Sequence, residues 1–123
     1  MFADRTHPPP ESLLPLRPAE LLILTMLTAG ERHGYGIRQD ILDHTRGAME
    51  LEAGNLYRHI RRLEDDGVLE ESERRPAASA DDERRRYYRL TPLGRRVLAA
   101  ELLRLRDLVR LAEERRVIAP EPT

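Results

Sequence analysis

The sequence predicts a mainly α-helical protein with one small β-hairpin and a long C-terminal helix. Two patterns support this prediction. Apolar residues recur at helical spacing in several segments, and one short segment alternates its side chains as a strand does. The chain has 123 residues, enough for a single modest core. Aromatic residues make up only 4% of the sequence, so we expect a core of leucine, isoleucine, valine and alanine.

The chain divides into four segments by composition. The first is rich in proline and has little periodicity, which indicates a flexible arm. Its three leucines (Leu13, Leu14 and Leu16) form a small apolar cluster that is able to dock on the folded body. The predicted boundaries are a flexible N-terminal arm over 1–17, a main unit over 18–91, a long C-terminal helix over 92–117 and a tail over 118–123.

Three helices are predicted within the main unit. The first runs from Pro18 to about Ala29 and is apolar on most faces, which is typical of a buried helix. The second follows a glycine-containing turn and runs to about His44. The third covers 53–66 and ends before a glycine. Its apolar residues form one stripe that must face the core: Leu56, Ile60 and Leu63.

Two extended stretches follow the third helix. They cover 68–75 and 85–90, and a polar loop separates them. The second alternates with the period of two that a half-buried strand requires, so we expect the two to pair as a hairpin. Thr91 and Pro92 then cap and start the last helix, which reaches about Arg116. Three short helices followed by a two-stranded wing describe the winged helix-turn-helix architecture.

Composition narrows the possible functions. With no cysteine, the chain has no disulfide, no thiolate metal site and no thiol nucleophile. No run approaches the roughly 18 apolar residues of a membrane span, and the proline-rich start lacks the apolar segment of a signal peptide. The histidines show no zinc-like spacing, and no serine has the surroundings of a nucleophile. We therefore expect a cytoplasmic protein without membrane contact, metal, cofactor or enzymatic activity.

Opposite its apolar stripe, the third helix carries a basic face with no acidic residue between Asn55 and Leu63. The formal net charge is −1, yet all 21 basic residues are arginine, whose forked guanidinium suits phosphates and guanine edges. A helix about 10–12 Å across fits a major groove about 12 Å wide. We therefore interpret it as a DNA-recognition helix; the alternative is an ordinary solvated face. Its candidate DNA-binding residues are Asn55, Tyr57, Arg58, His59 and Arg62, with Arg61 at the edge.

The predicted hairpin carries a second group of arginines. Arg84, Arg85, Arg86 and Arg89 lie on its second strand, and Arg74 and Arg75 lie on the first. Such a ribbon can run along phosphates or reach a minor groove, which makes Arg84, Arg85 and Arg86 further DNA-binding candidates. The same hairpin also carries six acidic residues. A ladder of internal salt bridges across the hairpin is therefore the alternative.

The last helix carries a pattern typical of helix association. Apolar residues step by four and three along it, as in the seam of a coiled coil. So broad an apolar face needs a partner, and a second copy of the chain is the simplest one. The alternative is that the seam folds back onto its own domain. The candidate dimer-interface residues are Leu98, Leu102, Leu105, Val109 and Ala112, flanked by Leu103, Leu108 and Leu111.

Four stretches in this order resemble the PadR-like transcriptional regulators. They are His33 to Ile37, Gly54 to Tyr57, Arg62 to Glu70 and Arg86 to Gly94, within a region covering roughly residues 18–117. The resemblance implies a winged-helix fold and a homodimer joined through its C-terminal helix. It also implies repression that a small-molecule inducer or a stress signal relieves. A single terminal helix is similar to the shorter branch of the family.

Two departures from the family pattern concern the third helix. Arg58 stands where the family often has proline, which adds a basic side chain to the predicted DNA face. Glu52 and Ala53 replace a serine-proline pair, which weakens the N-cap of the helix. The sequence thus predicts a dimeric, sequence-specific transcriptional regulator, acting as a repressor on double-stranded DNA at a palindromic operator. The alternative is a winged-helix protein-interaction module that binds an acidic partner.

Overall fold

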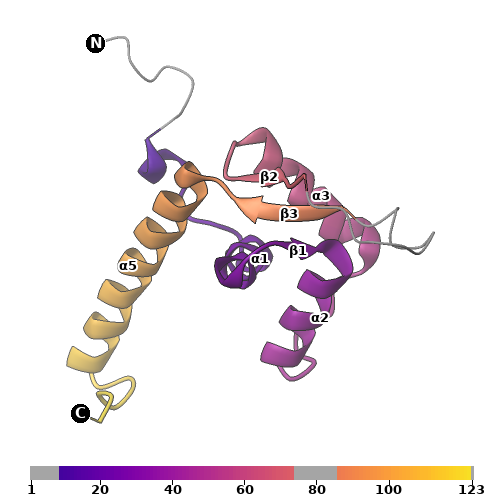
Figure 1. Ribbon diagram of the computed structural model, residues 1–123. Helices are drawn as coiled ribbons and strands as arrows, with labels where there is room; N and C mark the ends of the chain where they lie inside the picture. Colours follow the sequence, from indigo (N-terminus) through magenta and orange to yellow (C-terminus); the bar gives the residue numbers. More distant parts are fainter. Residues whose placement is uncertain (1–8, 74–85, 123) are drawn as a thin grey trace, which may run out of the picture.

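The computed structural model describes residues 9–73 and 86–122, which form one helical body with a small sheet (Figure 1). The α-helices are α1 (Pro18–Met26), α2 (Gly34–His44), α3 (Ala53–Asp65) and α5 (Pro92–Glu114). Two short 3-10 helices, η1 (Pro10–Leu13) and η2 (Leu27–Ala29), lie before and after α1. The strands are β1 (Arg32–His33), β2 (Leu69–Glu71) and β3 (Tyr87–Leu90). The mainly helical fold with a small β wing is thus as predicted.

The four α-helices of the described residues all contribute to one aliphatic core. The stripe predicted on α3 is confirmed, because Leu56, Ile60 and Leu63 are each about 1% exposed. Facing them are Ile23 and Leu24 of α1, Ile37 and Ile41 of α2, and Leu93, Val97 and Leu98 of α5. Tyr88 is the one aromatic side chain among the buried core residues that the structure describes. Its burial raises the pKa of the phenol to about 12.

The sheet has three antiparallel strands in the order β1-β3-β2. β2 and β3 form the predicted hairpin, in a register that places Glu70 opposite Arg89. β1 pairs with the other edge of β3 and was not predicted, since two residues are too few to show alternation. The described strands are shorter than the predicted stretches. Helix α5 ends at Glu114, two residues before the predicted Arg116.

The start of α5 is fixed by one junction with the end of α3. The Thr91 hydroxyl accepts a hydrogen bond from the Gly94 amide at 2.9 Å and donates one to the Gly67 carbonyl at 2.6 Å. The predicted cap is therefore present, and it also binds the turn after α3. A Cβ on Gly94 would collide with the carbonyl oxygen of Val68. Only glycine allows α5 to approach the backbone this closely.

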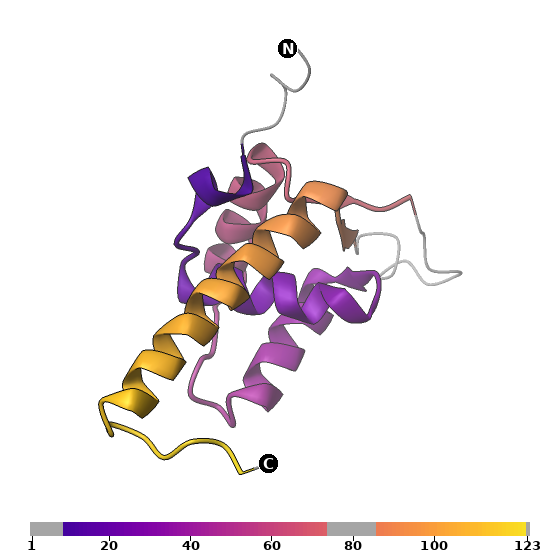
Figure 2. The same ribbon diagram turned by 90° about the vertical axis from the view of Figure 1, so that its left-hand side faces the viewer.

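The N-terminal segment departs from the predicted flexible arm in the part that the structure describes. From η1 onward it lies along α5, as both views show (Figures 1 and 2). The leucine cluster Leu13, Leu14 and Leu16 packs against the core, so its predicted docking is confirmed. The Leu16 amide donates to Oε2 of Glu101 at 2.8 Å. Arg104 donates to both oxygens of the same carboxylate, at 2.6 and 3.1 Å.

The Glu101 carboxylate therefore joins the N-terminal segment to α5. Its side chain is only 1% exposed, so it depends on these partners in place of water. The hydrogen bond from Arg104 lowers the pKa of Glu101, burial raises it, and the Leu16 amide lowers it again. The net shift is below the ordinary value of 4.5, which means that the ionised form is favoured in the folded protein.

The Gly94 junction predicts a large steric penalty. Gly94→Ala should lower the free energy of unfolding by about 3 kcal/mol or more, because the Val68 oxygen belongs to the backbone and has little room to retreat. Urea denaturation measures this. Gly54→Ala is the matched control, since a Cβ there meets nothing within 4 Å in a helical position. It should be neutral or stabilising by up to about 1 kcal/mol. Equal stability of the two variants would contradict the close approach.

Glu101 predicts a specific dependence of stability on pH. The pKa of Glu101 is lower in the folded protein than in the unfolded chain. Its contribution to the free energy of unfolding is therefore fully present above the unfolded pKa and is lost as the pH falls through the folded pKa. Wild type should therefore exceed Glu101→Gln by about 1–3 kcal/mol at neutral pH. The difference should shrink below about pH 5. Urea denaturation at several pH values measures it, with the exposed Glu114→Gln as control. A difference that grows at acid pH would contradict this assignment.

Candidate nucleic-acid interface

The outer face of α3 is basic and open to solvent. Asn55, Tyr57, Arg58, Arg61 and Arg62 are all exposed there, while the opposite stripe is buried in the core. No acidic residue interrupts this part of the helix. Arg61 was predicted at the edge of the face, but it lines a hollow of about 210 Å³ together with Gly54, Tyr57 and Arg58. Its side chain therefore belongs to the exposed face.

Tyr57 lies where α3 meets the start of α2. A Cβ on Gly34 would fall 2.5 Å from the Tyr57 hydroxyl oxygen, so the ring covers the first residue of α2. The stretches His33 to Ile37 and Gly54 to Tyr57 therefore meet in space. The second supplies the tyrosine ring, and Gly34 of the first leaves room for it. The start of α2 is held by His33, whose Nδ1 accepts a hydrogen bond from the Gly36 amide at 2.9 Å. Tyr57 is still partly exposed beside Arg58.

His59 does not share the open face, contrary to the sequence prediction. Its Nδ1 lies 2.8 Å from Oε2 of Glu20 on α1, and its side chain is largely covered. Nε of Arg62 lies 3.5 Å from the same oxygen. The charge of Glu20 also acts on Asp66 at the end of α3, where burial raises the pKa, Glu20 raises it further and Arg62 lowers it. One carboxylate of α1 therefore lies beside His59 and Arg62 of α3, and its charge also acts on Asp66 just after the helix.

In the described part of the wing, Arg89 forms a salt bridge within the hairpin, whereas Arg86 is mostly exposed. Nε of Arg89 donates to Oε2 of Glu70 across the strands at 2.8 Å, and Nη1 of Arg89 lies 3.7 Å from Oε1 of Glu31. The hydrogen bond to Glu70 raises the pKa of Arg89. Arg86 lies 3.8 Å from Glu71 and keeps a mostly exposed side chain. The candidates Arg84 and Arg85, like Arg74 and Arg75, lie outside the described residues.

The apolar face of α5 is shared between the core and the surface. Leu98 was predicted in an intermolecular seam, but it is 5% exposed and packs in the core of its own domain, so that prediction is wrong. Leu105 and Ala112 are half-buried. Beyond Leu98 the large apolar side chains turn outward. Those between 44% and 55% exposed are Leu102, Leu103, Leu108, Val109 and Leu111.

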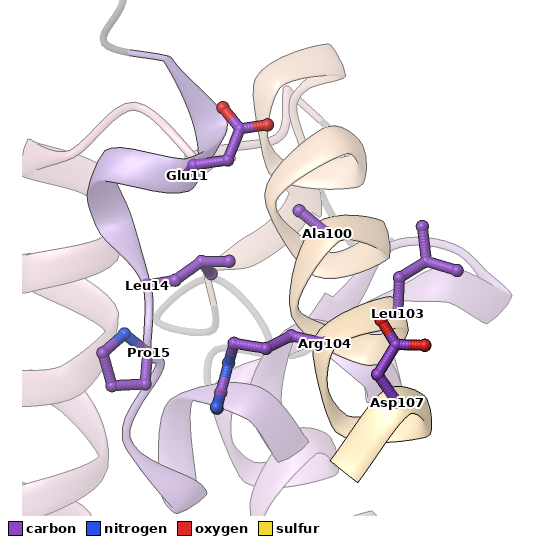
Figure 3. A pocket seen from close by; sticks show the side chains of 7 residues that line it. All are labelled: Glu11, Leu14, Pro15, Ala100, Leu103, Arg104 and Asp107. Carbon is purple, nitrogen blue, oxygen red and sulfur yellow. The ribbon is translucent and has the colours of Figure 1, made fainter. Parts of the chain in front are cut away.

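A groove of about 610 Å³ runs between α5 and the N-terminal segment (Figure 3). Leu14 and Pro15 line one side, and Ala100, Leu103 and Arg104 of α5 line the other. Sequence reasoning missed this groove, because a flexible arm forms no wall. Among the residues that the structure describes, no group of histidine and acidic side chains is arranged to hold a metal ion. Within the same residues, no helix is long and apolar enough to cross a membrane.

Two buried carboxylates were also missed by sequence reasoning. Glu20 stands in a run that is otherwise apolar, and Glu101 interrupts the apolar side of α5. An acidic residue inside an apolar stretch is the signal that was available, since such a residue is rarely buried without a partner. The partners themselves, on α3 and in the N-terminal segment, are distant in sequence and show no local pattern.

The three helices, the sheet and the hairpin together define a winged helix-turn-helix protein. The chain belongs to the PadR-like family of transcriptional regulators, because the model of that family matches residues 23–100. The match begins within α1, contains α2 and α3 and the described wing strands, and ends in α5. It therefore includes every described candidate DNA-binding residue.

Individual proteins are also similar to this chain. An uncharacterised protein of Lysinibacillus sphaericus is 32% identical over 78 residues, which are 63% of this chain and 69% of that protein. A PadR family transcriptional regulator from Eggerthella lenta is similar in structure, with a TM-score of 0.62 and 27% identity over 85% of this chain and 82% of that one. Bacillus subtilis PadR, solved in complex with operator DNA, has a TM-score of 0.59 at 23% identity, covering 70% of this chain and 48% of that one.

Proposed function

We propose that this chain is a sequence-specific DNA-binding protein that represses transcription as a homodimer on a palindromic operator in the cytoplasm. The observation that carries the proposal is the outer face of α3, where exposed arginines stand without an intervening acid above a fully buried stripe. A recognition helix needs such an exposed face to enter a major groove, and its opposite face must pack on the core so that the helix is held in place. Repression follows because a dimer bound at an operator excludes other proteins from the same DNA.

Base reading in this proposal comes from α3, and phosphate contacts come from the wing. Arg58 and Arg61 point away from the core, and a guanidinium can fork onto O6 and N7 of guanine. Asn55, near the start of the helix, can pair with adenine in the same groove. Arg86 is the described wing residue best exposed for a phosphate, and Arg84 and Arg85 are proposed for the same role. Residues 18–91 form the DNA-binding unit in this proposal.

Dimerisation is proposed through residues 92–117, using the outward part of α5. Five large apolar side chains on one helix, each about half exposed, are costly to leave in water. A second copy of α5 packed along the seam of Leu102, Leu105 and Val109 would cover the part of that surface that lies on one face of the helix. It would also place two copies of α3 on one duplex, and symmetric half-sites about one helical turn apart would match such a dimer.

The first experiment tests base reading. Arg58→Ala should weaken binding to the duplex that wild type selects from a random-sequence pool by about 1–3 kcal/mol, because one base-edge contact is lost. Mobility-shift titration measures this. Arg17→Ala removes the same charge from an exposed position outside both proposed units and should leave the affinity unchanged. If the wild type selects no duplex and is captured by acidic peptides instead, the protein-interaction alternative replaces this proposal.

The second experiment tests the dimer. Leu108→Asp should convert the dimer to a monomer, because it places a carboxylate in an apolar interface at a cost of several kcal/mol. Leu108 is largely exposed within one chain, so the fold itself should persist, which circular dichroism checks. Sedimentation at micromolar concentration measures the mass, with Ile118→Asp as control, because Ile118 is exposed and lies beyond the segment proposed for dimerisation. A wild type that sediments as a monomer would exclude cooperative reading of two half-sites.

A further inference from the structure

A buried carboxylate lies beneath the outer face of α3. Glu20, in the first turn of α1, has a side chain that is only 5% exposed. Its Oε2 lies 2.8 Å from Nδ1 of His59 and 3.5 Å from Nε of Arg62. An ionised carboxylate in such a place is costly unless partners replace the lost water. Two side chains of α3 supply that replacement, so α1 and α3 are joined by charge as well as by apolar packing.

Arg62 approaches Glu20 through Nε, which leaves the terminal nitrogens of its guanidinium able to contact DNA. Nδ1 of His59 lies 2.8 Å from Oε2 of Glu20, and a hydrogen bond there suits the tautomer that carries its proton on Nδ1. Nε of Arg62 approaches the same oxygen, yet the arginine side chain remains 47% exposed. A guanidinium carries five N–H donors in a fixed fork. Holding it through Nε therefore leaves the two terminal nitrogens able to face an acceptor outside the protein.

We propose that Glu20 is a specificity-determining positioning residue, which holds Arg62 in the orientation that reads a base edge. The inference rests on the proposed DNA-binding function and deepens it. A forked contact to guanine needs two donors aimed in one plane, whereas a freely rotating arginine also reaches phosphates, which carry no sequence information. Because Glu20 fixes the guanidinium before DNA arrives, less side-chain freedom is lost on binding. A residue of α1 thus shapes the choice of base by α3.

A purely structural clamp between α1 and α3 makes a different prediction. Losing a clamp lowers the free energy of unfolding and weakens binding to every duplex alike. Losing the positioning of Arg62 weakens binding to the preferred site while binding to unrelated DNA persists, since that binding depends on phosphate contacts. The ratio of specific to non-specific affinity is therefore the quantity that separates the two roles.

The central variant is Glu20→Gln, which keeps the volume and one acceptor for His59 but removes the charge facing Arg62. We expect its affinity for the site selected by wild type to fall about tenfold, within the range for one forked guanine contact. Affinity for unrelated duplex should stay the same or rise slightly, because a negative charge near DNA is gone. A new selection with this variant should lose one base preference in each half-site. Asp65→Asn, which removes an exposed negative charge at the end of α3, should keep the wild-type preference.

A double-mutant cycle with Arg62→Ala identifies the route of the effect. In the Arg62→Ala background, adding Glu20→Gln should change specific affinity by less than about twofold, because the positioned residue is already absent. A tenfold loss in this background as well overturns the proposal. Equal losses of affinity for selected and unrelated DNA in Glu20→Gln alone also overturn the proposal. Failure of wild type to enrich any duplex contradicts the DNA-binding function itself and is thus distinguishable from failure of this inference.

Arg62→Lys provides a second test that leaves the carboxylate in place. It keeps the charge on a half-exposed position, so the fold should persist, and a thermal melt checks this. An ammonium group is a single point charge and cannot contact Glu20 while forking onto a base. The variant should lose the same base preference as Glu20→Gln and retain its affinity for unrelated duplex. A retained preference overturns the proposal.

Discussion

The close contact of Gly94 with the Val68 carbonyl is the constraint on which the rest of the structure depends. It brings the start of α5 against the backbone that leaves α3, and Thr91 locks the same point by bonding to Gly67 and capping α5. The hairpin begins and ends at this junction as well, since Leu69 pairs with Leu90. The proposed reading helix, the wing and the proposed dimer helix therefore meet at one junction, and their relative orientation is fixed by the Gly94 backbone contact together with the two hydrogen bonds of the Thr91 hydroxyl.

The nearly neutral composition conceals an uneven distribution of charge. The sequence has 22 acidic and 21 basic residues, yet several described acids are neutralised within the fold. Glu101 is bound by Arg104, Glu70 by Arg89, and Glu20 by side chains of α3. The outer face of α3 keeps its arginines beside solvent. Attraction for an anionic partner depends on such local placement, so a net charge near zero is compatible with an interface for DNA.

The sequence predicted those features of the fold that depend on residues close together in the chain. The stripe on α3, the cap of α5 and the alternation of β3 follow from spacing and turn chemistry, and each is present in the structure. The pairing of Glu20 with His59 spans 39 residues, and that of Leu16 with Glu101 spans 85, so no window of the sequence contains either pair. The helical period also fails to say which partner covers an apolar residue. For that reason Leu98 was assigned to a dimer seam although its own domain buries it.

The division of α5 between core and surface bears directly on how a dimer would read DNA. Its first turns carry Leu93, Val97 and Leu98 into the core, and its later turns project away from the other helices (Figure 1). A dimer formed through the projecting part would connect to α3 through a helix that is already embedded in the same core. Because an α-helix transmits orientation along its length, the distance between the two copies of α3 would be set by the interface on α5. The seam proposed for association is therefore also the element that would select the spacing of half-sites.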